Sequence, residues 1–453
     1  MAGIFTEHTK KQMLLDMVNS FADSATRYYL AIGKSDEWND SDAAPTPVNS
    51  EKEIRDFRNN IQSILRTTDV SFVTPRYNWT TGTTYQAYDD SKTKTNNGSY
   101  YVITDTNRVY ICLRQGKTDA GVAVSSTVSP DSLGTSTSAG KLADGYVWKY
   151  LYTVSSLNQS KFVSANYMPV TYIDSAETGL TTIETAQRNV QNASLVGSIV
   201  GYRLVNGGTG YASKPTATII GDGDSAEVFL TFDSSTGSIL KATVRDSGSS
   251  FWFGSGYSFA EVSIADSATT QAVIKPIISV NGIGADARDD LRANALMFNA
   301  QPNGTQDGNF LVDQDFRQIG LVKNPTYLDS AFTGTAALAL DNMEVTSVSG
   351  FTSENIKDSL IRGTSSGAGA YADDLDGAII YYHQNDATGF TPFSEGEQIY
   401  DSDNPSRVGT IIAGGLNQGE IDKYSGTLMY IENRSPVLRD AQQTEDIKFI
   451  LQL

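Results

Sequence analysis

Near the start of the chain, apolar residues recur at helical spacing in two places, each behind a capping signal. The signals are Thr9-Lys-Lys-Gln12 and Ser50-Glu-Lys-Glu53. A Ser or Thr followed three residues later by Gln or Glu satisfies the free N–H groups of a first helical turn, and residues three or four positions apart share one helical face. The apolar residues behind the first signal are Met13, Leu14, Met17, Val18 and Phe21, and those behind the second are Ile54, Phe57, Ile61, Ile64 and Leu65. The pattern predicts two short amphipathic helices.

Most other apolar runs are short and rich in aromatic and β-branched residues, which is typical of strands. In the first half of the chain these runs are Tyr28–Ile32, Val70–Val73, Tyr100–Thr104, Val109–Leu113 and Val147–Val154. Asp105–Arg108 is interpreted as a hairpin turn between two of them. Thr118–Lys141 is rich in Ser, Thr and Gly without any period, so it is expected to be a long exposed loop, and such loops often carry contacts.

The residue pattern changes near Ser198, where an internal repeat of about 45 residues begins. Asn206–Ile220 is echoed by Ser247–Ile264, and each copy places a Gly-rich turn and a Tyr ahead of an alternating strand. A small β unit that stacks on a partner would need this order. The repeat predicts an inserted β domain.

A third region, about 340–420, again consists of short strands separated by Gly turns, which favours a compact β barrel. The runs that carry this prediction are Ser347–Phe351, Gly363–Gly369, Ala378–Tyr382, Phe393–Ile399 and Val408–Ile412. At the end of the chain, Thr427–Ile431 and Ile447–Leu453 are interpreted as paired strands. Ile447, Phe449 and Leu451 share one face at period two, so that face is expected to be buried.

These patterns together predict a mainly β protein, with a discontinuous layered β-sandwich core, a few short helices and inserted small β domains. The 453 residues exceed what one core usually organises, so several folding units are expected. The predicted map assigns 1–196 to the first part of the core and its helices, 197–270 to the Gly-rich repeat domain, 271–338 to a return to the core, 339–422 to the barrel-like domain and 423–453 to the strands that complete the core.

The net charge of the chain limits which macromolecules are expected to bind it. With 34 basic and 52 acidic residues the net charge is −18, which repels phosphate backbones and anionic lipid, so nucleic acid and membranes are not expected as partners. The chain has no apolar run of roughly 20 residues, and Met1–Lys11 lacks the build of a signal peptide. The expectation is a protein made in a cytoplasm that binds other proteins.

Residues that could carry chemistry are scarce. The two histidines, His8 and His383, are interpreted as solvated or capping residues, and the single cysteine, Cys112, as a buried thiol. Asp222–Ser225 and Asp373–Gly377 could hold calcium or supply a pair of glycosidase carboxylates, but both are interpreted as turns, and the Gly clusters lack the Lys-Ser or Lys-Thr of a phosphate loop. No cofactor, metal or catalytic residue is predicted.

Two segments are more distinctive, Asp144-Gly-Tyr-Val-Trp-Lys-Tyr-Leu-Tyr152 and Ser425-Gly-Thr-Leu-Met-Tyr-Ile-Glu-Asn-Arg-Ser-Pro-Val437. Both resemble segments of the baseplate wedge subunits of T-even-type contractile-tailed phages, the gene product eight family. Further similar segments follow in the family's order: Ala31–Trp38, Val73–Trp79, Asp315–Gly320 with Asn324-Pro325, and Gln443–Ile447. The resemblance covers about half of the chain, and the repeat and barrel regions, which depart from it, resemble glycine-rich modules of cyanophage-type tail proteins.

The resemblance implies a layered β-sandwich and a structural role in the tail baseplate of a virion. It implies a homodimer within each wedge, contacts with other wedge subunits and no enzymatic turnover. The expected structural or interface residues are Trp38, Arg76, Trp79, Tyr146, Trp148, Glu432, Asn433 and Arg434, with Pro75 beside them. For Arg76 and Arg434, ion pairs between subunits and within the chain both stay open. Two other functions remain: a receptor- or glycan-binding tail module, and a polysaccharide depolymerase that uses two carboxylates.

Overall fold

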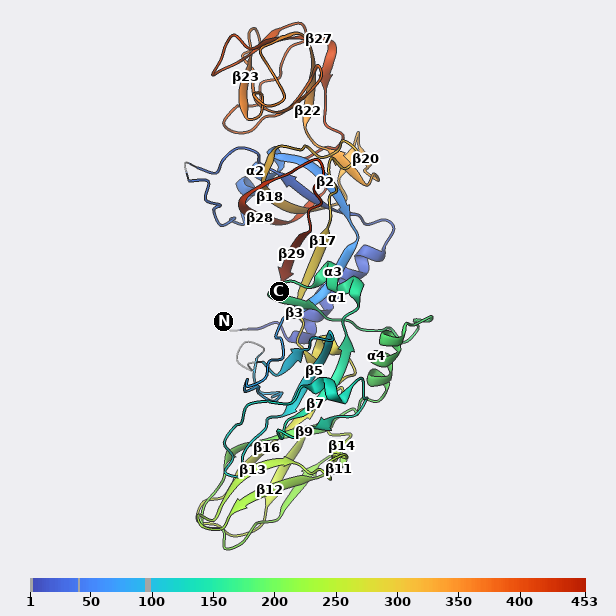
Figure 1. Cartoon of the computed structure of the whole chain (residues 1–453), viewed down its shortest axis with the longest axis vertical. Helices are drawn as coiled ribbons and strands as arrows, with labels where there is room; N and C mark the ends of the chain where they lie inside the picture. Colours follow the sequence, from blue (N-terminus) through green and yellow to red (C-terminus); the bar gives the residue numbers. More distant parts are fainter. Residues whose placement is uncertain (1–2, 40, 94–98) are drawn as a thin grey trace. The chain divides into compact units, whose positions relative to one another are not determined.

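The computed structural model describes residues 3–39, 41–93 and 99–453, and its contacts divide the chain into two compact units. Unit 1 comprises Met1–Leu15, Ser71–Met297 and Gln452–Leu453, and unit 2 comprises Asp16–Val70 and Phe298–Leu451. Strands dominate both units, so the predicted mainly β class is confirmed (Figure 1). The predicted boundaries of the inserted domains stay predictions.

The helices are short: α1 (Glu7–Ala22), α2 (Glu51–Asn59), α3 (Ser156–Phe162), α4 (Thr182–Asn192), α5 (Ala287–Asp290) and the 3-10 helix η1 (Pro130–Leu133). The capping signal of α2 is confirmed, since the Ser50 hydroxyl accepts a hydrogen bond from the N–H of Glu53 at 3.2 Å. The signal at Thr9 is wrong by one turn. Helix α1 begins at Glu7, and the N–H of Thr9 donates to the hydroxyl of Thr6 at 3.3 Å.

The second predicted helix is too long. Helix α2 ends at Asn59, and the apolar residues that appeared to continue its face form strand β2 (Ile61–Thr67). Five consecutive residues of β2 are buried, because the strand pairs on both sides, with β1 (Tyr28–Gly33) and with β21 (Ala336–Leu338). The apolar residues Ile61, Ile64 and Leu65 fit a central strand as well as they fit one face of a helix.

Unit 1 contains an aromatic sheet of strand order β4-β5-β7-β6. Its strands are β4 (Tyr101–Ile103), β5 (Arg108–Arg114), β7 (Val147–Thr153) and β6 (Gly140–Lys141). The predicted hairpin turn lies between β4 and β5, where Asn107 has a φ of 60°, a conformation that Asn tolerates better than most residues. Helix α4 packs against β7, and β3 (Asp69–Pro75) pairs with β8 (Tyr167–Pro169).

The repeat region of unit 1 forms four strand pairs, β9-β16, β10-β15, β11-β14 and β12-β13. The predicted copies meet in one of these pairs, because the strand of the first copy, β10 (Ala217–Gly221), pairs antiparallel with that of the second, β15 (Ala260–Ile264). The tyrosines ahead of these strands, Tyr211 and Tyr257, are both buried. The other strands are β9 (Ser198–Asn206), β11 (Asp224–Ala226), β12 (Val228–Asp233), β13 (Ser238–Val244), β14 (Phe253–Ser255) and β16 (Val273–Ser279).

Unit 2 contains a five-stranded antiparallel sheet of order β21-β2-β1-β18-β28, in which β18 spans Asp315–Lys323 and β28 spans Thr427–Leu438. Helix α2 places the ring of Phe57 against β18 at Gly320. A Cβ at Gly320 would lie 2.4 Å from that ring, so the close packing requires glycine. Strands β17 (Ala295–Ala300), β19 (Thr326–Tyr327), β20 (Ser330–Ala331) and β29 (Ile447–Gln452) complete the chain outside the barrel.

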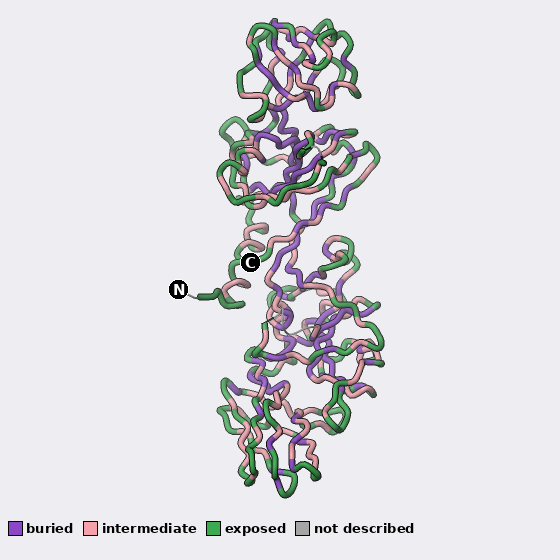
Figure 2. Tube along the Cα trace, turned by 90° about the vertical axis from the view of Figure 1, so that its left-hand side faces the viewer, coloured by how far each residue is buried: buried purple, intermediate pink, exposed green. Residues whose placement is uncertain are grey.

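The predicted barrel is observed in unit 2 as a closed, six-stranded barrel of order β22-β25-β24-β23-β26-β27, coloured orange to red in Figure 1. Its strands are β22 (Asp341–Ser349), β23 (Ser359–Gly363), β24 (Gly369–Asp376), β25 (Ile379–His383), β26 (Gln398–Asp401) and β27 (Val408–Asn417). Small and branched side chains fill it, among them Ala370, Ala372, Ile361, Ile380 and Ile399. Figure 2 shows buried positions along the strands and exposed positions along the loops.

The predicted pairing of the two C-terminal strands with each other is wrong. Strand β28 pairs with β18, and β29 belongs to a different sheet. The period-two burial within β29 is nonetheless present, since Ile447 and Phe449 are buried and Leu451 is half-buried. The ring of Phe449 stacks between those of Phe298 and Tyr430, at centroid distances of 4.9 and 5.2 Å.

Candidate interaction surfaces

The expected site residues of unit 1 serve its core. Tyr146 and Trp148 are fully buried in the aromatic sheet, and Trp79 packs against the same cluster. The hydroxyl of Tyr146 donates to the carbonyl of Val124 at 2.7 Å. Arg76 makes contacts within the chain, because its Nη1 donates to the carbonyl of Ser164 at 3.1 Å. The structure thus gives these residues packing and local hydrogen-bonding roles.

In unit 2 the structure brings four of the expected residues together at the edge strand β28. The indole N–H of Trp38 donates to the carbonyl of Arg434 at 3.1 Å, and the guanidinium of Arg434 pairs with Glu432 at 2.6 Å. Gln318 of β18 donates to the side chain of Asn433 at 2.8 Å. The ion pair of Arg434 is therefore internal, and the loop after β1 covers part of the exposed edge.

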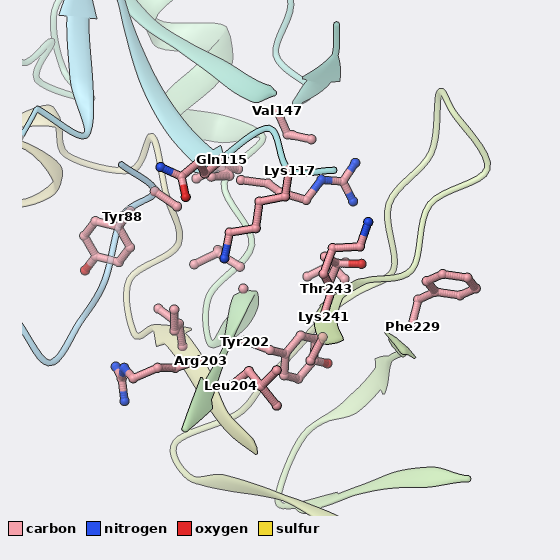
Figure 3. A pocket seen from close by; sticks show the side chains of 18 of the residues that line it. Tyr88, Gln115, Lys117, Val147, Tyr202, Arg203, Leu204, Phe229, Lys241 and Thr243 are labelled. Atoms are coloured by element: carbon pink, nitrogen blue, oxygen red, sulfur yellow. The ribbon is translucent and has the colours of Figure 1, made fainter. Parts of the chain in front are cut away.

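A cleft that the sequence did not reveal lies within unit 1. It has a volume of about 800 Å³. Its walls come from the segment 86–92, from the end of β5 and the loop that follows it, and from strands β9, β12 and β13 (Figure 3). Tyr88, Tyr202 and the half-exposed Phe229 contribute aromatic surface. A cavity of this size with aromatic and polar lining is within the range of ligand sites.

The lining carries a surplus of positive charge, although the whole chain is strongly acidic. Six cations line the cleft against three carboxylates, Asp89, Asp119 and Asp246. The cations are Lys92, Arg114, Lys117, Lys141, Arg203 and Lys241. The difference of three positive charges gives the cleft the opposite sign to the net charge of −18. Such a cleft attracts anionic groups.

Each of the three carboxylates is already paired. Asp246 lies 2.7 Å from Arg114 and 3.3 Å from Lys141, and Asp119 lies 3.2 Å from Lys241. Burial pushes the pKa of Asp89 upward, but hydrogen bonds from Arg203 and Ser91 outweigh burial and lower the pKa to about 2. The pKa of Asp246 is lowered in the same way by Arg114 and Lys141, against the effect of burial. A glycosidase needs one carboxyl that keeps its proton near neutral pH, so neither Asp89 nor Asp246 suits that role.

The prediction for His383 is wrong. Its side chain is 1% exposed, and Nδ1 lies 2.7 Å from Asp373 Oδ2 inside unit 2. Asp373, predicted to lie in a turn, sits in β24 and also accepts a hydrogen bond from Ser35 at 3.1 Å. The pair therefore belongs to a buried polar network around the barrel. His8 is exposed on α1, and Cys112 is a buried free thiol, as predicted.

Two kinds of structural feature are absent from the described part of the chain. No group of three or more His, Cys, Asp or Glu side chains there is placed to hold a metal ion. No helix among the described residues is long and apolar enough to span a membrane.

The cleft had no local signature in the sequence. Its cations lie between positions 92 and 241, and no motif joins them. The one relevant signal was the Ser/Thr-rich loop Thr118–Lys141, which supplies Asp119 and Lys141 to the lining. A scan against protein-family models and a search of curated proteins found no match to this chain.

Proposed function

We propose that the chain is a structural subunit of the baseplate of a contractile phage tail, which assembles into the virion through contacts with other wedge subunits. In this role it forms a homodimer within each wedge and carries out no catalytic turnover. Acidic surface charge suits such a protein, because it disfavours nucleic acid and membranes and leaves proteins as partners.

One observation carries the proposal. Three segments that resemble the wedge-subunit family, Ala31–Trp38, Asp315–Gly320 and Ser425–Val437, are far apart in the sequence but overlap strands β1, β18 and β28. These strands are neighbours in one sheet. Ala31 pairs with Gly320, and Gly320 in turn pairs with Ile431. Scattered chance similarities would have no reason to converge on adjacent strands, whereas a shared fold core would place them there.

Contacts beside these strands show that residues of the same segments stabilise the sheet. Gly320 makes room for the ring of Phe57, and Trp38 closes over the main chain of Arg434. Both contacts join residues of the resembling segments or of the helix between them. Their chemistry is packing and main-chain hydrogen bonding, as expected of residues that build a fold.

A receptor- or glycan-binding tail module is the second candidate, because the cleft in unit 1 combines aromatic side chains with cations. Acidic sugars would suit such a lining. The depolymerase is less well supported, since Asp89 and Asp246 are held ionised by their cationic partners.

Electron microscopy of native particles tests the proposal. Antibodies raised against the purified chain should label the tail base, and a map should show copies of the chain in pairs around the sixfold axis. Labelling of fibre tips, together with adsorption of the purified chain to host cells and binding on a glycan array, would establish the receptor-binding function instead. Absence of the chain from purified virions would refute both.

A further inference from the structure

Two strands present an edge to the cleft in unit 1, in addition to the face of the β12–β13 pair that carries Phe229, Thr231, Lys241 and Thr243. The lining includes five consecutive residues of β9, Val200–Leu204, and five consecutive residues of β13, Leu240–Val244. Successive side chains of a strand point to opposite faces, so a cavity beside one face would meet only alternate residues. Contact with every residue in a row therefore indicates that the cavity runs along the edge of the strand.

The hydrogen bonds of β13 show which main-chain groups face outward. The N–H of Arg245 donates to the carbonyl of Glu227 at 3.0 Å, and Val244 is in register with Val228. In an antiparallel pair, residues alternate between those that bond to the partner strand and those whose N–H and C=O point away from it. Ala242 and Val244 are thus the residues whose main-chain groups point away from β12.

Within the described residues, neither edge is taken up by another strand. Strand β13 pairs with β12 alone, and β9 pairs with β16 alone. The two strands are tied at one end, where the N–H of Ile239 donates to the carbonyl of Gly207 at 2.9 Å. Side chains from both strands, including Tyr202, Arg203, Lys241 and Thr243, line the same pocket in Figure 3.

Polar atoms in the cleft wall also lack partners. The hydroxyl of Tyr202 and Nη2 of Arg114 are buried and make no hydrogen bond with any described residue. Lys117 forms no ion pair with the part of the chain that the structure describes, and its side chain projects into the pocket in Figure 3. The two buried atoms are closed off from the cleft, whereas the ammonium group of Lys117 can pair with an anionic group inside it.

We propose that the cleft receives an extended, acidic segment of a neighbouring polypeptide, which adds a strand to the edge of β13 and places carboxylates near Lys117 and Arg114. The free strand edge supplies the main-chain pairing, as in other complexes formed by strand addition. The positive surplus of the lining selects an acidic sequence. This inference deepens the proposed function and rests on it for the source of the segment, a neighbouring subunit of the assembly.

Strand addition explains the strand edges better than binding of an acidic saccharide does. Alternating N–H and C=O groups repeat along Ala242–Val244 at the spacing of another main chain. An acidic saccharide would use the cations and the aromatic rings but would have no need of this edge. An added strand would therefore form hydrogen bonds with the main chain of β13, whereas a saccharide would not need them.

The test measures binding of a fluorescent peptide, Glu-Val repeated four times, to the purified full-length chain by anisotropy at low ionic strength. The charge-reversed peptide, Lys-Val repeated four times, is the control, and an oligogalacturonate is the competing acidic saccharide. We expect the acidic peptide to bind at least roughly tenfold more tightly than the basic one. Hydrogen exchange of the amides of Ala242 and Val244 should slow when the acidic peptide is added.

Variants separate charge from main-chain pairing. The double variant Lys117→Glu and Lys241→Glu should weaken binding by roughly tenfold or more, whereas Lys52→Glu, which lies in unit 2, should leave it unchanged. Ala242→Pro removes an outward N–H without changing charge, which an edge position tolerates, and should also weaken binding. If Ala242→Pro is misfolded by circular dichroism, the same substitution at Val244 replaces it.

Equal binding of the two peptides, or no change in amide exchange at Ala242 and Val244, would overturn the proposal. Binding of the oligogalacturonate with no binding of the peptide would assign the cleft to acidic saccharides and overturn it as well. The two proposals can fail separately. If the chain is located at the baseplate but does not bind the acidic peptide, only the strand addition is refuted. If the chain binds the peptide but is absent from the baseplate, only the proposed function is refuted.

Discussion

The buried ion pair that follows β28 offers the sharpest test of what stabilises unit 2. The guanidinium of Arg439 donates to both carboxylate oxygens of Glu445, each at 3.0 Å. It also donates to the carbonyls of Leu311, at 2.9 Å, and Gly304, at 2.6 Å. The side chains of Arg439 and Glu445 are only 2% and 6% exposed. One side chain thus ties the end of the edge strand to two loops.

Replacing Arg439 with methionine keeps most of the volume but removes every one of these bonds. Removing one partner of a buried pair costs about 3–5 kcal/mol, because the remaining charge is left uncompensated. Each carbonyl left without a donor adds about 1–3 kcal/mol, less whatever entering water recovers. We expect a loss of about 5 kcal/mol, which is a large part of the roughly 5–15 kcal/mol that stabilises a domain.

The double variant Arg439→Met and Glu445→Leu tests whether the unpaired carboxylate causes most of the loss of stability. It removes the carboxylate of Glu445, which the single variant leaves buried without a partner. Apolar replacement of both members of a buried ion pair often changes the free energy of unfolding little. The two carbonyls still lose their donor, so a loss of about 2–3 kcal/mol is expected. The double variant should therefore be more stable than Arg439→Met alone.

Urea unfolding measures these differences, and unit 2 has its own reporter. Of the four tryptophans, Trp38 lies in unit 2, while Trp79, Trp148 and Trp252 lie in unit 1. Replacing the latter three with phenylalanine leaves Trp38 fluorescence to follow unit 2. The control is Arg434→Met on β28, whose partly exposed ion pair should be worth about 1 kcal/mol or less. If Arg439→Met costs no more than this control, or the double variant is the least stable, the reasoning is refuted.

Three further predictions concern single residues. Burial raises the pKa of Asp290 to about 8, against about 3.9 in an unfolded chain, so the folded state holds an extra proton between these values. The stability of unit 1 should therefore fall as pH rises through this interval, and urea midpoints of Asp290→Asn should not show that fall; an unchanged slope would contradict the assignment. Burial also raises the pKa of the Cys112 thiol, which should resist a disulfide reagent until the protein is unfolded; rapid labelling of the native chain would show that it is accessible. Phe449→Ala should destabilise unit 2 by about 3–5 kcal/mol, because Phe449 is 2% exposed between two rings. Lys448→Ala, which removes an ion pair with Asp446, should cost about 1 kcal/mol or less in the same urea assay, and equal costs would show that β29 is not anchored by the face of Phe449.

Local patterns predicted much of the secondary structure. The aromatic and β-branched runs correspond to β1, β3, β4, β5 and β7, and the capping signal at Ser50 marks the start of α2. The repeat was also visible, and its two copies contribute the paired strands β10 and β15. These features depend on side-chain alternation, turn residues and capping, which act over a few neighbouring residues.

Errors arose where distant partners decide the outcome. Ile61, Ile64 and Leu65 fit a helical face, yet β1 and β21 flank them and make a central strand. His383 looked solvated at a strand end, but Asp373 of the neighbouring strand β24 covers it. The C-terminal strands looked like a pair because they are close in sequence, whereas β28 pairs with β18, about 110 residues earlier.

By itself, the sequence determined the mainly β class, the acidic character, the repeat and the barrel region. Only the tertiary structure decided that Ala31–Trp38, Asp315–Gly320 and Ser425–Val437 meet in adjacent strands, and that cations between Lys92 and Lys241 surround one cleft. Hydrophobic periodicity specifies which face of an element is buried, but it does not specify what covers that face. Strand pairing and the assembly of a cleft depend on contacts between distant residues, and such contacts exist only once the chain has folded.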